Sequence, residues 1–154
     1  LPQSTIAAAR ERFGETSPVY DALTAAAAGP VTAMHDATEG GINNALLELA
    51  GASQVGLDVE RDRFPVGEGV TELCEYFDID PWTSSSEGSV LLAVDRSGVD
   101  DVLDAFEAED IRASAVGAVT ESADVVVDGE RIDAPKRDPF WPAYERAREE
   151  FGVR

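Results

Sequence analysis

A chain of 154 residues has the size of one domain, and at this length folding buries about two-thirds of the unfolded chain's surface, so folding requires neither metal nor disulfide. The formal net charge of −19 argues against nucleic acids and anionic membranes as partners, because clustered Lys and Arg bind both. A single cysteine, no charged apolar leader and no run of about 18 apolar residues predict a cytoplasmic protein without internal disulfides.

The first third of the chain predicts two helices, a strand and a third helix. The helices cover residues 5–13 and 19–28. Ser17-Pro18 marks the start of the second helix, and Gly29-Pro30 ends it. A short buried strand is expected at residues 31–34, before the Gly40-Gly41 turn. In the helix that follows, apolar residues recur at i, i+3, i+4, i+7 and i+8, namely at Ile42, Ala45, Leu46, Leu49 and Ala50.

The remaining chain alternates strands and helices. Strands are predicted at residues 56–60, 90–94, 113–120, 125–127 and 131–132, the last two joined by an Asp128-Gly129 hairpin turn. Helices are predicted at residues 66–77, 99–106 and 140–151. This order predicts one α/β (α+β) domain over residues 1–154, a mixed sheet covered by helices in three α/β/α layers. Residues 1–30 form a helical lead-in, 31–134 the core and 138–154 a terminal helix.

The acidic residues are spread along the chain and do not form a tail. Many Asp and Glu, abundant Ala and only one lysine, Lys136, are typical of proteins from a high-salt cytoplasm, where salt screens the repulsion among like charges. We therefore predict a halophilic protein. Because the first residue is Leu1 and not Met, we also expect the chain to be part of a longer protein.

The turn between the first strand and the third helix is the first candidate site. A strand that enters a helix through two glycines can hold an anion against backbone amides, and Gly40 and Gly41 permit close approach. Asp36 could hold magnesium or orient a substrate, Thr38 could donate a hydroxyl hydrogen bond, and His35 could transfer a proton. The alternatives are a tight turn for the glycines, a helix N-cap for Thr38, an Asx turn for Asp36 and a structural hydrogen bond for His35.

A second polar turn, residues 83–88, leads into the apolar strand at Val90. Its hydroxyls and amides could receive phosphate or a polar substrate, and Glu87 could act as a base or ligand, although a solvated loop has the same composition. Cys74 lies on an apolar helical face and is expected to be inert core and not a nucleophile. The sequence has no zinc-ligand spacing and no phosphate-binding loop that ends in Gly-Lys-Ser/Thr.

Three motifs between Val31 and Glu121 give the chain a resemblance to a known family. Residues 31–41 are similar to a strand followed by an Asp-Pro-Thr-Arg-Gly-Gly turn. Phe64-Pro65-Val66, Cys74-Glu75 and Asp80-Pro81 resemble its middle helix, and residues 86–91 resemble an Asn-Glu-Gly turn into a strand. The chain thus resembles the C-terminal domain of the aminoimidazole ribonucleotide (AIR) synthase superfamily, and most of all its hydrogenase-maturation-factor branch.

The resemblance implies a homodimeric enzyme that uses ATP and magnesium to phosphorylate an oxygen of an amide-like or acid substrate, carried by a small molecule or a protein. It implies that an N-terminal domain, absent from this chain, supplies most nucleotide contacts and the dimer barrel, while this domain closes the cleft. We expect the isolated chain to be inactive. The expected catalytic residues are His35, Asp36 and Thr38, with Asp36 also the metal ligand, and the expected substrate- or phosphate-binding residues are Gly40, Gly41, Asn43, Ser86, Glu87 and Gly88.

Two departures distinguish the chain from that branch. Ala37 and Glu39 replace the commoner Pro and Arg, and the chain ends at Arg154 without the branch's reactive terminal cysteine. The His-Ile-Thr-Gly-Gly-Gly pattern of AIR synthase itself is not matched. We therefore expect an AIR synthase-related protein with its own substrate. The alternative is a catalytically silent domain of the same fold that dimerises or regulates a partner.

Overall fold

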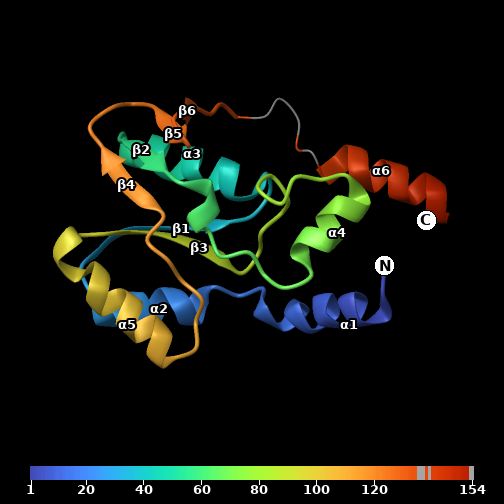
Figure 1. Cartoon of the computed structure of the whole chain (residues 1–154). Helices are drawn as coiled ribbons and strands as arrows, with labels where there is room; N and C mark the ends of the chain where they lie inside the picture. Colours follow the sequence, from blue (N-terminus) through green and yellow to red (C-terminus); the bar gives the residue numbers. More distant parts are fainter. Residues whose placement is uncertain (135–137, 139, 153–154) are drawn as a thin grey trace.

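The computed structural model describes residues 1–134, 138 and 140–152, and helices and strands alternate along them much as the sequence predicts. The helices are α1 (Gln3–Glu11), α2 (Val19–Ala28), α3 (Gly41–Ser53), α4 (Val70–Phe77), α5 (Val99–Ala108) and α6 (Phe140–Phe151) (Figure 1). The strands are β1 (Val31–Ala37), β2 (Gly56–Val59), β3 (Ser89–Val94), β4 (Gly117–Thr120), β5 (Val125–Val127) and β6 (Glu130–Arg131).

The strands form two sheets and not the single mixed sheet that the order of elements predicts. Strands β1 and β3 pair antiparallel as a two-stranded sheet, and the other sheet has the order β4-β2-β5-β6. Within it β2 and β5 are parallel and the remaining pairs antiparallel, so the mixed α/β class is confirmed. Hydrophobic patterning identified the strands, but it carries no information on which strands pair.

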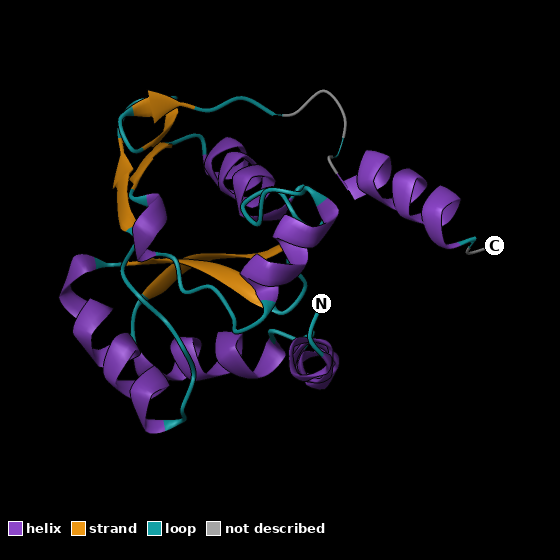
Figure 2. Ribbon diagram, turned by 45° about the vertical axis from the view of Figure 1, so that its right-hand side comes forward, coloured by secondary structure: helices purple, strands orange, loops and turns teal. Residues whose placement is uncertain are grey.

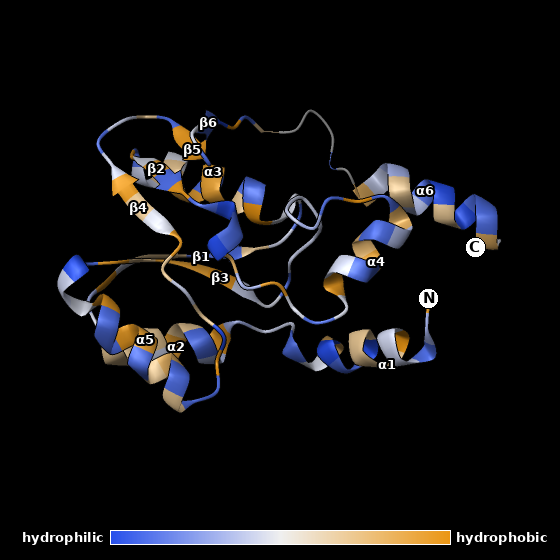
Figure 3. Cartoon of the chain, viewed as in Figure 1, coloured by the Kyte–Doolittle hydropathy of each residue, from blue (hydrophilic) through white to orange (hydrophobic). Residues whose placement is uncertain are grey.

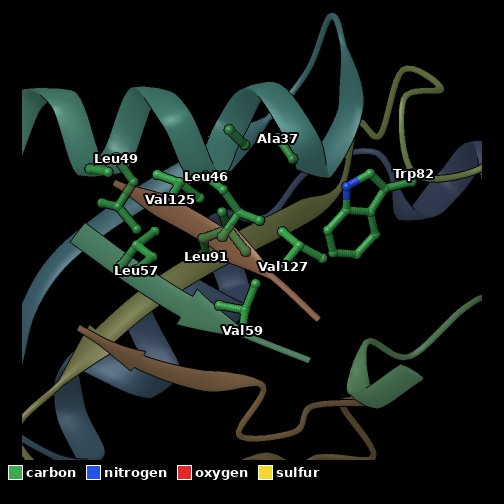
Figure 4. Packing of buried hydrophobic residues seen from close by; sticks show 11 residues of the cluster. Ala37, Leu46, Leu49, Leu57, Val59, Trp82, Leu91, Val125 and Val127 are labelled. Carbon is green, nitrogen blue, oxygen red and sulfur yellow. The ribbon is translucent and has the colours of Figure 1, made fainter. Parts of the chain in front are cut away.

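Helix α3 packs against strands of both sheets and forms the main core with them (Figure 4). Its predicted apolar stripe is confirmed, because Ala45, Leu46, Leu49 and Ala50 are buried against residues of β2, β3 and β5. A second cluster joins Ala25 of α2 to Val102 and Phe106 of α5 beneath the β1–β3 sheet (Figure 2). The apolar stripe of each of these helices thus determines which of its faces packs against a sheet or a neighbouring helix.

The outside of these layers carries both acidic and apolar side chains, and Val19 and Leu23 of α2 are among the exposed apolar ones. Hydrophilic residues are visible on α5 in Figure 3, and its acidic residues Asp100, Asp101 and Asp104 are exposed. Among the described residues, no helix is both long enough and apolar enough to span a membrane.

Some element bounds differ from the predicted ones. Strand β1 continues to Ala37, three residues past its predicted end, so His35 and Asp36 lie in the strand and not in the turn. Helix α4 begins at Val70 and β4 at Gly117, each four residues later than predicted. β1 is longer because its pairing with β3 continues through polar residues that hydrophobicity alone does not assign to a strand.

Candidate functional site

The two polar turns singled out by the sequence lie at the same end of the β1–β3 sheet. Antiparallel pairing puts Ala37, at the end of β1, opposite Ser89, at the start of β3. The first turn (residues 38–41) therefore lies beside the second turn (residues 83–88). The carbonyl oxygen of Thr38 accepts hydrogen bonds from the amide of Gly41 at 3.0 Å and from the amide of Ser86 at 3.3 Å, which joins the turns directly.

Gly41 fills a position where no side chain fits. Its φ is +64°, and a Cβ atom would lie 2.7 Å from the carbonyl oxygen of Trp82 and closer still to that of Ser84. The Asn43 amide donates to the same Trp82 oxygen at 3.1 Å. The amides of Gly41 and Asn43 therefore already donate to carbonyl oxygens of this chain. Gly41 has the role that a tight strand-to-helix turn gives a glycine, which is the structural alternative stated above.

The amide of Gly40 has a different partner. It donates to Oδ2 of Asp138 at 3.1 Å, and Oδ1 of Asp138 accepts from the amide of Phe140 at 2.8 Å. Gly40, with φ +77°, occupies the N-cap of α3, so the alternative that Thr38 caps this helix is wrong. A carboxylate beside the N-cap of a helix lies where the helix dipole favours negative charge. This amide is therefore suited to an anionic ligand.

His35 and Asp36 point to opposite faces of β1, as consecutive strand residues do. Nε2 of His35 lies 2.8 Å from Oε2 of Glu48 on α3, which is the hydrogen bond that the structural alternative expected. Asp36 is exposed and has no hydrogen bond or ion pair with any described residue. Its position inside β1 rules out the Asx turn. The structure thus separates the two side chains that the sequence had placed in one turn.

Asp36 offers one carboxylate to a cation. Within the described part of the chain, no group of three or more His, Cys, Asp or Glu side chains has the geometry of a metal site. Magnesium bound to a nucleotide commonly uses one or two protein carboxylates, with phosphate oxygens and water completing the octahedron. A lone, unpaired carboxylate fits that role and does not fit a metal site built by this domain alone.

The second turn borders a large groove. Ser86 Oγ donates to the Ser84 carbonyl at 2.8 Å, and Ser85 Oγ donates to Glu87 Oε1 at 2.8 Å. Gly88 has φ +93°, and a Cβ atom there would collide with the carbonyl oxygen of Glu15. The groove has a volume of about 1310 Å³, and Ser86, Glu87 and Gly88 all line it.

Of the predicted site residues, only those of the second turn, Ser86, Glu87 and Gly88, line the groove. Residues of β3, α5 and β4 make up much of the groove wall, which includes Leu92, Phe106 and Val119. The described residues that line it do not include His35, Asp36, Thr38, Gly40, Gly41 or Asn43. The predicted site residues are therefore near one another in the fold but do not face one cavity within this chain.

Cys74 is buried, as predicted. Burial raises the pKa of its thiol, and a hydrogen bond with Ser84 opposes the effect only in part. The thiol therefore stays protonated at neutral pH, and a protonated thiol is a poor nucleophile. The prediction that Cys74 belongs to the core is confirmed.

Sequence reasoning missed four residues of this region. Trp82 is buried, packs edge-to-face on Phe64 with ring centroids 4.7 Å apart, and carries the carbonyl that Asn43 binds. Its amide donates to Asp80 Oδ1 at 3.0 Å, which closes an Asp-Pro-Trp turn. Such a turn can be predicted from sequence, because Asp often accepts from the amide two residues later. The other missed residues, Asn44, Glu48 and Asp138, had no local signal, because their partners are distant or on another element.

The chain is similar to known proteins in both sequence and structure. The profile of the family described as AIR synthase related protein, C-terminal domain, matches residues 4–130. A hydrogenase expression/formation protein of Methanocaldococcus jannaschii is 32% identical over 117 residues, or 71% of this chain and 35% of that protein. Carbamoyl dehydratase HypE of Escherichia coli is 30% identical over 117 residues, with the same two shares covered.

Solved structures give the same result. The crystal structure of E. coli HypE, a hydrogenase maturation protein, matches with a TM-score of 0.66 at 29% identity, over 76% of this chain and 39% of that chain. A hydrogenase maturation protein HypE solved in complex with ATP shares the fold, with a TM-score of 0.62 at 23% identity over 73% of this chain and 38% of that chain. The chain thus spans well under half the length of the relatives that it matches.

Proposed function

The chain belongs to the AIR synthase related protein family as its C-terminal domain, and we propose that it closes the substrate cleft of an ATP-dependent enzyme that phosphorylates an amide-like or acid substrate. The observation that carries the proposal is the hydrogen bond from the Ser86 amide to the Thr38 carbonyl. It brings together the two turns whose sequences carry the family resemblance. Binding and catalytic residues are found more often on loops than on the elements that the loops connect. Two turns that carry these motifs and are hydrogen-bonded to each other therefore form a candidate site.

The relatives support the nucleotide part of the proposal. One relative at 30% identity is a carbamoyl dehydratase, and a protein of the same fold was solved with ATP bound. By this analogy, ATP supplies the terminal phosphoryl group that turns a substrate oxygen into a leaving group. Most nucleotide contacts, and a homodimer contact, are proposed to come from an N-terminal domain outside this chain.

The described residues fit an anionic nucleotide with its metal. The Gly40 amide already binds a carboxylate, Asp138, and the same N–H would bind a phosphate oxygen when that carboxylate is displaced. Asp36 would provide one oxygen to magnesium, and the Thr38 hydroxyl would donate to a phosphate or substrate oxygen. Ser86, Glu87 and the Gly88 backbone would contact the substrate from the groove side.

Turnover measurements on two proteins test this proposal. The 154-residue chain alone is expected to release no phosphate from ATP, whereas the complete protein that carries it is expected to consume ATP with magnesium when a carbamoylated or other amide-bearing substrate is supplied. Robust turnover by the isolated chain would contradict the proposal that an N-terminal domain supplies most nucleotide contacts. No ATP consumption by the complete protein with any such substrate would favour the alternative, a silent dimerisation or regulatory domain.

A further inference from the structure

Helix α2 exposes a continuous apolar face. The side chains that form it are at least half exposed where they are large, with relative exposures of 61% for Val19, 58% for Tyr20 and 65% for Leu23. Ala26 and Ala27 are exposed as well. At about 100° of rotation per residue, these five positions fall within an arc of about 120° on the helix surface. They are called the α2 stripe below.

The opposite side of α2 is already covered. Ala25 packs against Val102 and Phe106 of α5 in the second core cluster. Asp21, the only charged residue of the helix, lines the groove and not the α2 stripe. Helix α2 is therefore apolar on two opposite sides, and a helix with that pattern is normally buried on both of them.

The charge of the chain limits what can cover the α2 stripe. On α5, which lies beside α2 (Figure 1), exposed positions carry carboxylates, namely Asp100, Asp101 and Asp104. A cationic partner would bind such acidic surfaces and gain nothing from an uncharged one. A second copy of this chain, which also carries a charge of −19, is repelled by the acidic surfaces. It can pack closely only where carboxylates are missing, as they are along the α2 stripe.

The order of side chains also makes the α2 stripe complementary to itself. Its positions are symmetric about Leu23, with bulky residues three and four positions before it and alanines three and four positions after it. Two copies of α2 can therefore pack antiparallel about a two-fold axis at Leu23. The bulky end of each helix then lies against the alanine end of the other, so that large side chains meet small ones.

Tyr20 is held in position before any such contact forms. Its hydroxyl donates to Oε2 of Glu109, the C-cap residue of α5, at 2.6 Å. The ring therefore has little rotational freedom to lose when a partner packs against it, which lowers the entropic cost of association.

We propose that the α2 stripe is a homodimer contact in which Leu23 of one copy packs on Leu23 of the other across a two-fold axis. This contact goes beyond the proposed function and does not depend on it. Helix α2 has ten residues and is about 15 Å long, too short to bury the roughly 800 Å² per partner of a standard interface. The dimer is therefore weak, with an expected Kd above about 1 µM, and molar salt should favour it by screening the repulsion between copies.

A cysteine at the two-fold axis tests the geometry. Helices packed about 8–10 Å apart, with Cα atoms about 2.3 Å from each axis, bring facing Cα atoms to about 3.4–5.4 Å, which overlaps the range of about 4.4–6.8 Å found in disulfides. Leu23→Cys should form a covalent dimer under mild oxidation in molar potassium chloride. The matched control is Val119→Cys, at an apolar position of β4 that is 52% exposed, and it should cross-link at least about tenfold more slowly. Wild type, whose Cys74 is buried, should not cross-link.

Sedimentation of the 154-residue chain in molar potassium chloride measures the association itself. Wild type should pass from monomer to dimer between about 10 µM and about 1 mM. Leu23→Glu places two carboxylates opposite each other at the centre of the contact and should weaken association by about 30-fold or more. Val119→Glu, the matched control, should associate as wild type does, and circular dichroism checks that both variants are folded.

Three results would each overturn the proposal. They are a wild-type chain that stays monomeric at about 1 mM, a dimer that Leu23→Glu leaves intact, and cross-linking no faster at residue 23 than at residue 119. A monomeric chain, together with protection of Leu23→Cys from alkylation in the complete protein, would assign the α2 stripe to another part of that protein in place of a second copy.

Discussion

The amide of Asn43 donates to the carbonyl oxygen of Trp82 at 3.1 Å, so the start of α3 is bound to the loop that follows α4. Gly41 lies against the same carbonyl. The contact makes the geometry of the Gly-Gly motif depend on a tryptophan 41 residues further along the chain. The two glycines also differ in role, because Gly41 packs against backbone while the Gly40 amide donates to a carboxylate.

Gly41→Ala is therefore expected to destabilise the fold. A side chain at φ +64° costs about 1–2 kcal/mol, and the approach to the Trp82 and Ser84 carbonyls adds to this. The control is Gly51→Ala in the same helix, where a Cβ atom would meet nothing within 4 Å and the helix should gain up to about 1 kcal/mol. Chemical denaturation measures both, and equal effects of the two substitutions would count against the packing role of Gly41.

Asp138 is expected to anchor the start of α6. Its carboxylate accepts from the Phe140 amide, as an N-cap does, and from Gly40 on α3. Asp138→Ala should cost about 0.5–2 kcal/mol and speed hydrogen exchange in the first turn of α6. Asp104→Ala on the exposed side of α5 is the control, and the same exchange in both variants would contradict the anchor.

Local patterns were enough to predict most of the fold but only part of the site. The apolar stripe from Ala45 to Ala50 and the Asp128-Gly129 hairpin were predictable because neighbours in sequence determine them. The pairing of β1 with β3, which brings Thr38 close to Ser86, was not predictable from neighbours in sequence.

The same distinction holds for single residues. His35 and Asp36 were assigned to one turn, since nothing local predicted that the strand continues past its apolar residues. The partner of His35 was missed for a different reason, because Glu48 reads as a solvated helix residue until α3 is placed beside β1.

Salt should stabilise this chain. With a net charge of −19, repulsion among carboxylates opposes the compact state at low ionic strength, and salt screens that repulsion over about 3 Å at 1 M compared with about 30 Å at 0.01 M. The midpoint of thermal unfolding should rise between dilute buffer and molar potassium chloride. A flat or falling midpoint would show that the acidic surface is not an adaptation to salt.

Cys74 gives a prediction on pH. Because burial raises the pKa of its thiol above the ordinary value of 9.0, the stabilisation linked to this group is complete below pH 9 and is lost as the pH rises through the folded-state pKa. Wild type should therefore lose more stability than Cys74→Ala between pH 8.5 and a pH of about 10.5. Parallel losses in both proteins would mean that the thiol is not desolvated.

Magnesium-dependent ATP consumption by the complete protein carrying Asp36→Asn tests whether this domain takes part in nucleotide use. Asparagine has nearly the same shape as aspartate but no charge, and Asp36 has no partner among the described residues, so the fold should be unaffected. If Asp36 binds magnesium, kcat/KM for ATP should fall by about tenfold or more, a loss of about 1.4 kcal/mol of transition-state stabilisation, while Asp104→Asn behaves as wild type. An unchanged kcat/KM in Asp36→Asn would contradict a role for the β1 end in nucleotide use.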